Sequence, residues 1–504
     1  LRGSRGKVVL LARDPEKRRR VLTPPSEEIK GSTNSASRAD RDGSVVLNSG
    51  LILASILTSL PGYINHTSAW QCPLLSGLSL PSVTDECYTV RMKSPEAAQP
   101  PLESVSPEFR PYLTSTGLAG IAIAMQQLLL AWILIGILEL PASEVGLVQA
   151  VVGIPGIVLI LLGGAKADGM DARALLIKVY ACAPILPLFL VVMLIFSQIA
   201  LWNILLWGLG MSFVISYTSP AQQALLNRVA RGEVQKSVSA ASAIGFIVQI
   251  MGLAVAGTLE ILGLVPVLLI QLVCFALAAL MVARISPSKP KVAARESTLL
   301  QLKKGLAAIA ARPVIAQALS INFISSIFNA GSFMTVFPFI VRRIYEGDAF
   351  LLSMMMVIFY CGATASSLAM MRFMPLERPG RIFLLMQLSR MFILGIMWLQ
   401  PALWVFAIAA VLWGINMGVT LTLARTIVQE SATEEFRGRI MSVFTLGLLG
   451  SAPIGAIVLG FMIETFGTLN ALLPAMLLSL GLFLYGVFFS HVYHYKSPTG
   501  AAAS

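Results

Sequence analysis

Long apolar runs alternate with short polar loops along most of this chain. Twelve such runs lie between Leu113 and Phe489, in two groups of six on either side of a basic, proline-containing segment. About 20 apolar residues in a helix span roughly 30 Å of hydrocarbon, and a helix satisfies its own backbone hydrogen bonds there. The sequence therefore predicts an all-α membrane protein with 12 transmembrane helices in two pseudo-symmetric six-helix halves. The predicted helices are 113–138, 145–165, 174–196, 200–221, 238–261, 265–282, 314–341, 351–371, 382–399, 403–423, 440–463 and 469–489.

Composition agrees with this class. Of 504 residues, 56% are hydrophobic and 12% charged, with a mean hydropathy of +0.79, whereas soluble domains carry about 25% charged residues. The net charge of +12 would suggest nucleic acid in a soluble chain, but the basic residues lie mainly in short loops, so no nucleic-acid partner is expected. The five cysteines have no pairing or metal-ligand spacing, and no disulfide, metal or cofactor is expected.

The distribution of Lys and Arg between the loops predicts the orientation. One set of loops is rich in basic residues, and the opposite set offers only Arg342 and Arg343 beside Glu139, Glu144, Glu346 and Asp348. Basic loops face the cytoplasm. Both termini and the central segment are therefore expected on the cytoplasmic side.

Composition also predicts the domain boundaries. Residues 1–105 read as a disordered, basic N-terminal extension; a late signal peptide is one alternative, and translation starting at Met92 is the preferred one. On that reading the glycosylation triplet beginning at Asn65 is a chance match. The remaining segments are a six-helix half at 106–285, a cytoplasmic linker with a short amphipathic pattern at 286–313, a second half at 314–490 and a cytoplasmic tail at 491–504.

The two halves share a short pattern that indicates duplication. Residues 233–238 lead into a helix with Gly252 and Gly257, and residues 435–440 lead into a helix with Gly455 and Gly460. Small residues let membrane helices approach closely. Repeats related by an axis along the membrane normal are typical of alternating-access carriers.

Several motifs resemble those of the major facilitator superfamily. The loop GGAKADGMDAR at residues 163–173 is similar to its signature loop. The segments ARGEVQKSVSAASA at 230–243, EFRGRIMS at 435–442 and PIGA at 453–456 resemble the branch that includes the enterobactin exporter and macrolide efflux permeases. The resemblance covers about residues 106–490. The chain departs from the family pattern at Gly169, Ala172, Gln249 and Leu253, which leaves the coupling mechanism less secure than the fold.

The resemblance implies a gate at the cytoplasmic junction of the halves. The Asp168 carboxylate would lie near the N-terminus of helix 440–463, an anion–dipole contact worth about 0.3–1 kcal/mol when exposed. We expect this contact to favour the outward-open state; the alternative is that these charges only set topology. The gating residues implied are Gly164, Asp168, Asp171, Arg173, Glu435, Arg437, Gly438 and Arg439.

The resemblance also implies that the first, fourth, seventh and tenth helices line a central cavity. Arg390 is added because it lies well inside an apolar run, where ionisable residues are usually functional. Each polar residue could instead hold helices together. The predicted cavity residues are Gln126, Gln127, Ser212, Ser216, Tyr217, Asn322, Asn329, Arg390, Asn416 and Thr420.

Together these features predict a secondary active transporter in a bacterial-type cytoplasmic (inner) membrane. It would export an amphipathic small molecule, drug-like or siderophore-like, by alternating access, as a monomer in the lipid bilayer. Proton coupling is implied by the resemblance alone. The alternatives are a lipid or metabolite carrier and a non-transporting sensor or scaffold. An enzyme is not expected, because the three histidines lie outside the predicted bundle and the sequence has no phosphate-binding glycine loop.

Overall fold

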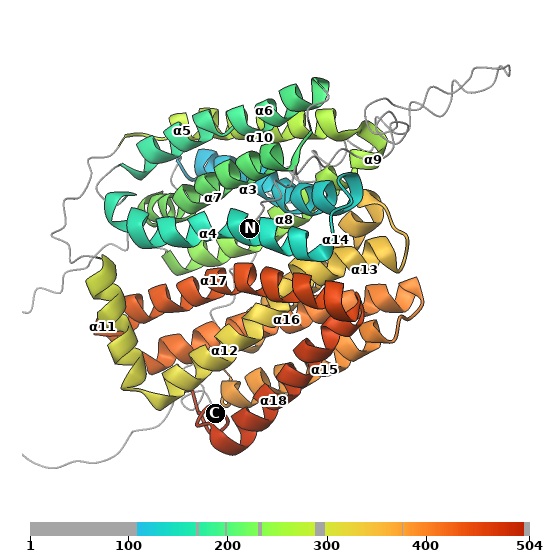
Figure 1. Cartoon of the computed structure of the whole chain (residues 1–504). Helices are drawn as coiled ribbons and strands as arrows, with labels where there is room; N and C mark the ends of the chain where they lie inside the picture. The colour runs from blue at the N-terminus through green and yellow to red at the C-terminus, as the bar shows by residue number, and fades with distance from the viewer. Residues whose placement is uncertain are drawn as a thin grey trace, which may run out of the picture. The chain divides into compact units, whose positions relative to one another are not determined.

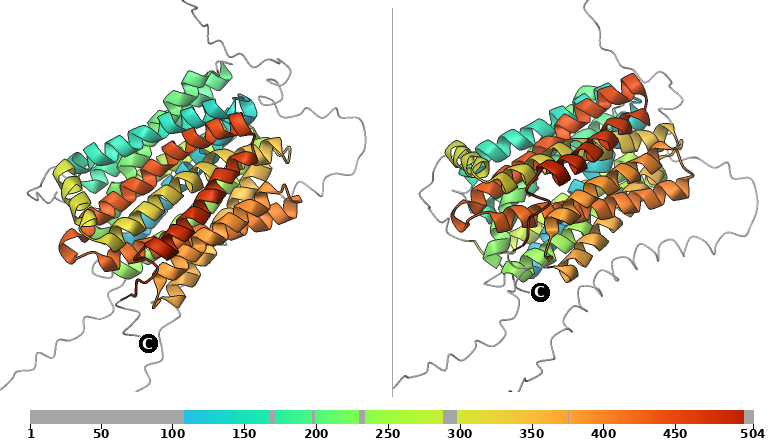
Figure 2. Two further views of the ribbon diagram at one scale, coloured as in Figure 1. Left: turned by 60° about the horizontal axis from the view of Figure 1, so that its bottom comes forward. Right: turned by 90° about the horizontal axis from the view of Figure 1, so that it is seen from below.

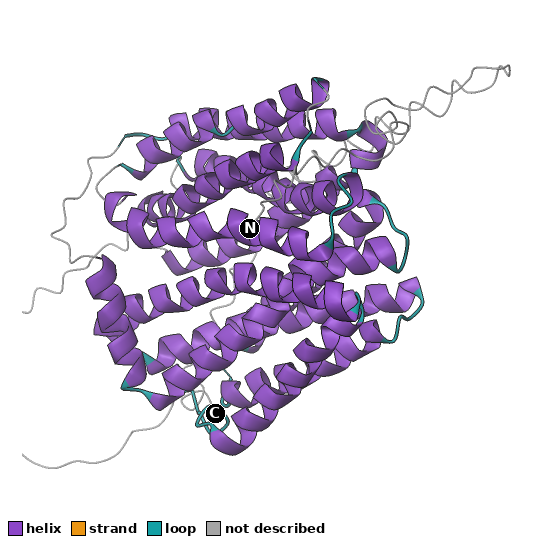
Figure 3. Ribbon diagram, viewed as in Figure 1, coloured by secondary structure: helices purple, strands orange, loops and turns teal. Residues whose placement is uncertain are grey.

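The computed structural model describes residues 108–167, 171–196, 199–229, 234–287, 298–374 and 376–497. Within these ranges the chain is helical and no strand occurs (Figure 3). The sequence predictions for Met92, the triplet at Asn65 and the Asp168 gate fall outside the described residues.

The first half contains six membrane-length helical runs, as predicted. Three runs are interrupted. The first passes into a π-helical turn, the third is broken at Pro184, whose nitrogen has no hydrogen to donate, and the fifth is broken at Thr258. The elements are α3 (Phe109–Trp132) with η1 (Ile133–Ile137), α4 (Ala142–Ala167), α5 (Ala172–Cys182) with α6 (Ile185–Ile195), α7 (Leu201–Val229), α8 (Val234–Gly257) with α9 (Leu259–Leu262), and α10 (Leu264–Ala283).

The second half repeats this order after a linker helix, α11 (Thr298–Ala310). Among the residues that the structure describes, eleven runs are long and apolar enough to cross a membrane, and the 26-residue α4 is the twelfth, which confirms the predicted fold class. The elements are α12 (Pro313–Gly331) with η2 (Ser332–Val336) and α13 (Phe337–Arg343), α14 (Ala349–Phe373), α15 (Pro379–Trp398), α16 (Leu403–Ser431), α17 (Glu434–Phe466), and η3 (Asn470–Leu472) with α18 (Leu473–Phe489).

The two halves pack through two pairs of helices. In Figure 1, α3–α10 lie above α12–α18, and α17 runs beside α4. The second pair is α8 with α14. The linker helix α11 packs on α17 across one end of the bundle (Figures 1 and 2). We call this the linker end, and the opposite end, where α9 and α13 lie, the far end.

Glycines make these helix pairs possible. Gly252 packs against the backbone of α3 and Gly455 against that of α12, each within its own half. Gly257 packs against α14 and Gly460 against α4, each across the junction of the halves. None of the four sites has room for a Cβ. The predicted close approach is confirmed. In each half the first glycine contacts a helix of the same half, and the second contacts a helix of the opposite half.

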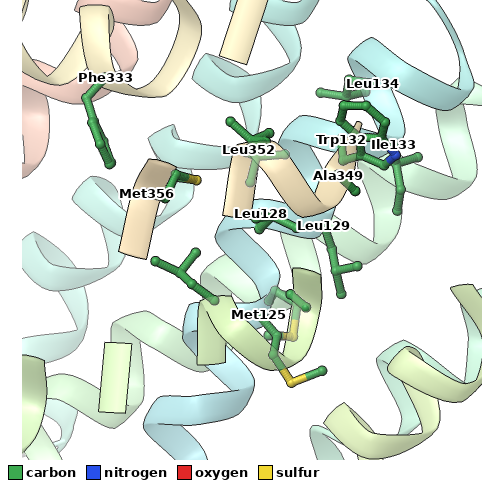
Figure 4. Close-up of a cluster of buried hydrophobic side chains, with 14 of the residues drawn as sticks. Met125, Leu128, Leu129, Trp132, Ile133, Leu134, Phe333, Ala349, Leu352 and Met356 are labelled. Atoms are coloured by element: carbon green, nitrogen blue, oxygen red, sulfur yellow. The ribbon is translucent and has the colours of Figure 1, made fainter. Parts of the chain in front are cut away.

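A buried hydrophobic cluster seals the junction toward the far end. Trp132 is 6% exposed, and Leu128, Leu129, Ala349, Leu352 and Met356 are at most 1% exposed. Because lipid is as apolar as these side chains, close packing rather than water exclusion holds them together. Figure 4 shows its members Leu128, Leu129 and Trp132 from α3, with Ala349, Leu352 and Met356 from α14.

We expect Gly460→Ala to weaken the far-end contact. An added Cβ would lie 2.6 Å from the backbone oxygen of Ala142, so α4 and α17 must separate, at about 1–3 kcal/mol. Thermal unfolding of the purified protein measures this. Gly481→Ala in α18 is the matched control, because a Cβ there meets open space; it should be neutral or stabilising. Equal loss in both variants would contradict the assigned contact.

Candidate functional site

A cavity of about 360 Å³ lies between the halves at the middle of the bundle. On one side it is lined by α3, α4, α7 and α8, and on the other by η2, α13, α14 and α17. Pockets of roughly 300–1,000 Å³ hold drug-sized molecules. The cavity therefore has the size of a small-molecule site.

The two walls of this cavity differ in chemistry. All the polar lining side chains come from the first half: Gln126, Gln127, Gln149, Ser212, Ser216, Ser219 and Gln249. The second-half wall is apolar: Met334, Pro338, Met356, Leu449, Ala452, Pro453 and Ala456. None of the lining residues that the structure describes carries a charge. The cavity is thus amphipathic and electrically neutral.

Amides dominate the polar wall. Gln249 Nε2 donates to Gln127 Oε1 over 2.7 Å, and the Tyr360 hydroxyl of α14 lies 3.4 Å from the same oxygen. Gln126 is only 5% exposed, yet neither its Oε1 nor its Nε2 has a hydrogen-bond partner. One amide of the wall is therefore left unsatisfied.

Gln149 binds the opposite half directly. Its Nε2 donates to the Met334 carbonyl over 3.1 Å, and the Thr335 hydroxyl donates to its Oε1 over 3.0 Å. Both partners lie in the π-helical turn η2, which displaces the backbone from the regular helix. This glutamine consequently joins the cavity wall to the junction between the halves.

The cavity opens toward the linker end. The lining face of α7 continues at four-residue spacing into Ser219 and Gln223, which are exposed. The lining face of α17 continues from Leu449 back through Thr445 and Ser442, which are also exposed. Solvent can therefore reach the cavity between these two faces.

Two carboxylates close the far end. Glu464, at the end of α17, accepts hydrogen bonds from Ser143 N over 3.1 Å and from its hydroxyl over 2.8 Å. Glu260 accepts from Ala349 N over 3.3 Å. Each carboxylate lies on one half and caps the N-terminus of a helix, α4 or α14, of the other half, where an anion is favoured.

A cation adds a further far-end contact. The guanidinium of Arg342 lies 4.0 Å from Glu139 and 5.6 Å from the centre of the Trp132 ring. Both partners belong to the first half, whereas Arg342 ends α13. The far end is thus joined by backbone caps, an ion pair and a cation–π contact.

The structure brings four of the ten predicted cavity residues into the cavity: Gln126, Gln127, Ser212 and Ser216. The others lie elsewhere. Tyr217 packs against the hydrophobic core, Asn329 Oδ1 accepts from Trp413 Nε1 over 2.7 Å, and Thr420 is buried in α16. Asn322 lines a separate groove described below.

Arg390 and Asn416 belong to a buried network inside the second half. Arg390 is 3% exposed; its Nε and Nη2 donate to Asn416 Oδ1 over 3.2 and 3.1 Å, and its Nη1 donates to Ser325 and Gln387. Asn416 Nδ2 donates to Ser389 over 2.8 Å. The arginine therefore ties α12, α15 and α16 together through neutral oxygens and does not line the cavity.

Those predicted gating residues that the structure describes lie at the linker end of the bundle. Asp171 caps α5 through a 3.2 Å bond from Arg173 N, and Arg173 Nη2 donates to the Ala283 carbonyl over 2.8 Å, all within the first half. On α17, Arg437 is exposed and Gly438 adjoins open space.

The remaining gating predictions are only partly described. Arg439 lies over the Phe436 ring of its own helix. Gly164 and Glu435 lie on α4 and α17 where side chains are not described.

The same end holds an ion pair that fixes the start of α3. Glu108 lies 3.4 Å from Arg228 at the end of α7 and accepts from Ser286 N over 3.2 Å. Hydrogen bonds from the side chain and the backbone of Ser286, together with the positive charge of Arg228, hold the pKa of Glu108 below its ordinary value. The contact joins helix ends within the first half.

Sequence reasoning missed Gln149, Ser219 and Arg425. Gln149 is the single amide in an otherwise apolar run, a signal that could have identified it if the second helix had been included among the lining helices. Arg425 lies just beyond the predicted helix 403–423, but α16 extends to Ser431 and includes it. Among the described residues, no group of three or more His, Cys, Asp or Glu could hold a metal ion.

A second, larger cavity of about 770 Å³, which we call the apolar groove, lies between α4, α11, α12 and α17. Its lining is apolar except for Ser320 and Asn322. It shares Ile157 and Pro453 with the central cavity, so these two side chains form a common wall.

Comparison with known proteins agrees with this architecture. A sequence model of the transmembrane secretion effector family, MFS_3, matches residues 100–498. No curated protein sequence gives a significant match. The nucleoside transporter NupG is similar in structure, with a TM-score of 0.60 at 15% identity over 77% of this chain and 99% of that chain.

Two further solved structures have the same fold. The human organic anion transporter MFSD10 has a TM-score of 0.56 at 14% identity, covering 75% of this chain and 99% of that one. A bacterial homologue of the human lysosomal transporter Spinster, inward-facing and unoccupied, has 0.56 at 13%, covering 77% and 96%. At these identities the likeness concerns the fold alone.

We expect Arg390→Met to lower stability without changing solute recognition. The substitution leaves the buried Asn416 Oδ1 without a donor and removes the arginine donor from Ser325 and Gln387, at about 1–3 kcal/mol in total. Thermal unfolding measures the loss, and the KM for transport should stay within about twofold of wild type because Arg390 lines neither of the two cavities described above. Arg437→Met, at an exposed site, is the control. A raised KM with unchanged stability would instead place Arg390 in the binding site.

Proposed function

The chain belongs to the transmembrane secretion effector family of the major facilitator superfamily, and we propose that it exports a neutral amphipathic small molecule by alternating access. One observation carries this proposal: a mid-depth cavity reached from one end while the other end is closed by contacts between the halves. This is the geometry expected for one of the two states of such a carrier.

The lining supports the substrate class. Amides and hydroxyls on the first-half wall can bind neutral polar groups, and the apolar second-half wall can hold a hydrophobic body. An ionised solute would enter a lining without a countercharge, which is unfavourable at membrane depth. A molecule with one neutral polar edge and one apolar face fits both walls.

The charge of the loops supports the direction of transport. The linker end carries most of the Lys and Arg residues, so it is assigned to the cytoplasm of a bacterial-type inner membrane. The cavity then opens to the cytoplasm, which is the loading state of an exporter. The chain has no phosphate-binding glycine loop, so an ion gradient is the energy source that remains.

Glu260 and Glu464 are the best candidates for proton coupling. Both are exposed at the far end, which this orientation places outside. Removing the negative charge of either carboxylate would weaken its contact with the N-terminus of a helix of the other half, which would link the charge at the far end to outward opening.

The apolar groove favours a second candidate, a carrier of lipophilic metabolites or lipids. Ile157 and Pro453 line both the apolar groove and the central cavity. A solute that enters the groove from the bilayer would therefore have a short route to the central cavity. Flux of lipid analogues separates this alternative from export of water-borne amphiphiles.

Export can be tested in inverted vesicles with a compound panel that pairs neutral amphiphiles with charged analogues. We expect accumulation of the neutral members, driven by an imposed pH gradient acid inside, and little flux of the charged ones. Accumulation that ignores the gradient removes the proton coupling. No flux of any compound removes the transport function and favours a scaffold.

We expect Glu260→Gln with Glu464→Gln to shift the carrier toward far-end opening. Each lost anion–dipole contact is worth about 0.3–1 kcal/mol, so together they change the ratio of the two states about 3- to 30-fold. A cysteine replacing Ala452 in a cysteine-free background reports this, by its labelling rate with an impermeant thiol reagent from the far side. Glu377→Gln at the linker end is the control. An unchanged labelling rate in the double variant would show that the carboxylates do not hold the closure.

A further inference from the structure

A purely structural role does not explain a glutamine at position 126. It is 5% exposed and both polar atoms of its amide lack a partner. Buried polar groups are almost always hydrogen-bonded, since leaving one unsatisfied is unfavourable. A methionine would fill the same space without that penalty. The side chain also lines the central cavity.

The neighbouring amides extend this site. The Gln127 acceptor is used by Gln249 and Tyr360, and the Gln249 donor is used by Gln127. The Gln127 Nε2 donor and the Gln249 Oε1 acceptor are not used in these hydrogen bonds. Both residues line the same cavity as Gln126. The polar wall therefore offers further donors and acceptors to the same ligand, with no charge among them.

We propose that Gln126 recognises an amide edge on the transported molecule, that is, a neutral group with an N–H donor directly beside a C=O acceptor, as in a lactam or a carboxamide. This inference rests on the proposed transport function and specifies its substrate class. A primary amide presents one donor and one acceptor side by side, so an amide edge pairs with it through two parallel hydrogen bonds. A carboxylate offers two acceptors and an ammonium only donors, and either leaves one Gln126 atom unsatisfied.

The opposite wall accepts the rest of such a molecule. Met334, Met356 and Leu449 face the polar wall across the cavity and provide apolar, partly flexible contacts. A planar ring fused to a lactam has one polar edge and two apolar faces. It therefore matches the chemistry of both walls.

A set of three related compounds tests the recognition. The probes are 2-quinolinone, its N-methyl derivative, which lacks the donor, and coumarin, the lactone in which oxygen replaces N–H. Binding to the full chain in lipid nanodiscs is measured by calorimetry. We expect 2-quinolinone to bind about tenfold more tightly than either analogue, the effect of one or two neutral hydrogen bonds in a dry site.

Gln126→Met should abolish this preference, so that the three probes bind alike. Its unliganded thermal stability should equal or exceed that of wild type, because an unsatisfied amide is removed; a merely structural glutamine would give a loss. Gln222→Met is the matched control. Gln222 lies on α7, its Nε2 donates to the Tyr180 hydroxyl, and it lines neither cavity. It should keep the lactam preference.

Three results would overturn the proposal. The first is equal binding of all three probes to wild type, and the second is a lactam preference that survives in Gln126→Met. The third is no binding of 2-quinolinone at its solubility limit, which would indicate that only water hydrogen-bonds the Gln126 amide. Flux in the inverted vesicles separates this failure from that of the function. Neutral amphiphiles that move without lactam preference leave the transporter intact, whereas absence of all flux removes both.

Discussion

Close backbone contact between the two halves at the far end is the constraint on which this structure depends. In a bilayer no hydrophobic drive brings helices together, so association needs small residues and satisfied polar groups. Gly257 and Gly460 supply the first, and Glu260 and Glu464 supply the second by capping helices of the opposite half. Closing this end leaves the cavity with one opening, at the linker end. A carrier built this way can change state by releasing a few localised contacts.

The duplicated scaffold carries a lining that is not duplicated. Gln249 lies three residues before Gly252, and Ala452 lies three residues before the equivalent Gly455. Gln149 is the eighth residue of α4, and Met356 is the eighth of α14. At both pairs of positions the first half contributes an amide and the second an apolar side chain. Symmetry thus fixes where the cavity is, and its departures from symmetry give the cavity a polar and an apolar wall.

The sequence predicted the helices and the glycine contacts because apolar length and small residues act locally. It could not tell which face of each helix meets the cavity, since these helices are apolar all round and have no amphipathic stripe. Arg390 and Asn416 therefore looked equivalent to Gln126, although the structure places them in a network inside one half. The end of α16 was also misplaced, because Arg425 resembles a loop residue when its surroundings are unknown.

The described residues that line the cavity include no ionised side chain, and this has an electrical consequence. Moving one elementary charge across a membrane potential of 100 mV involves about 2.3 kcal/mol. A lining of amides, hydroxyls and hydrocarbon transfers no charge of its own when it is exposed first on one side and then on the other. The potential can therefore act on the reorientation of the lining only through charge carried by a solute or a coupling ion, and a neutral cargo makes that step insensitive to voltage.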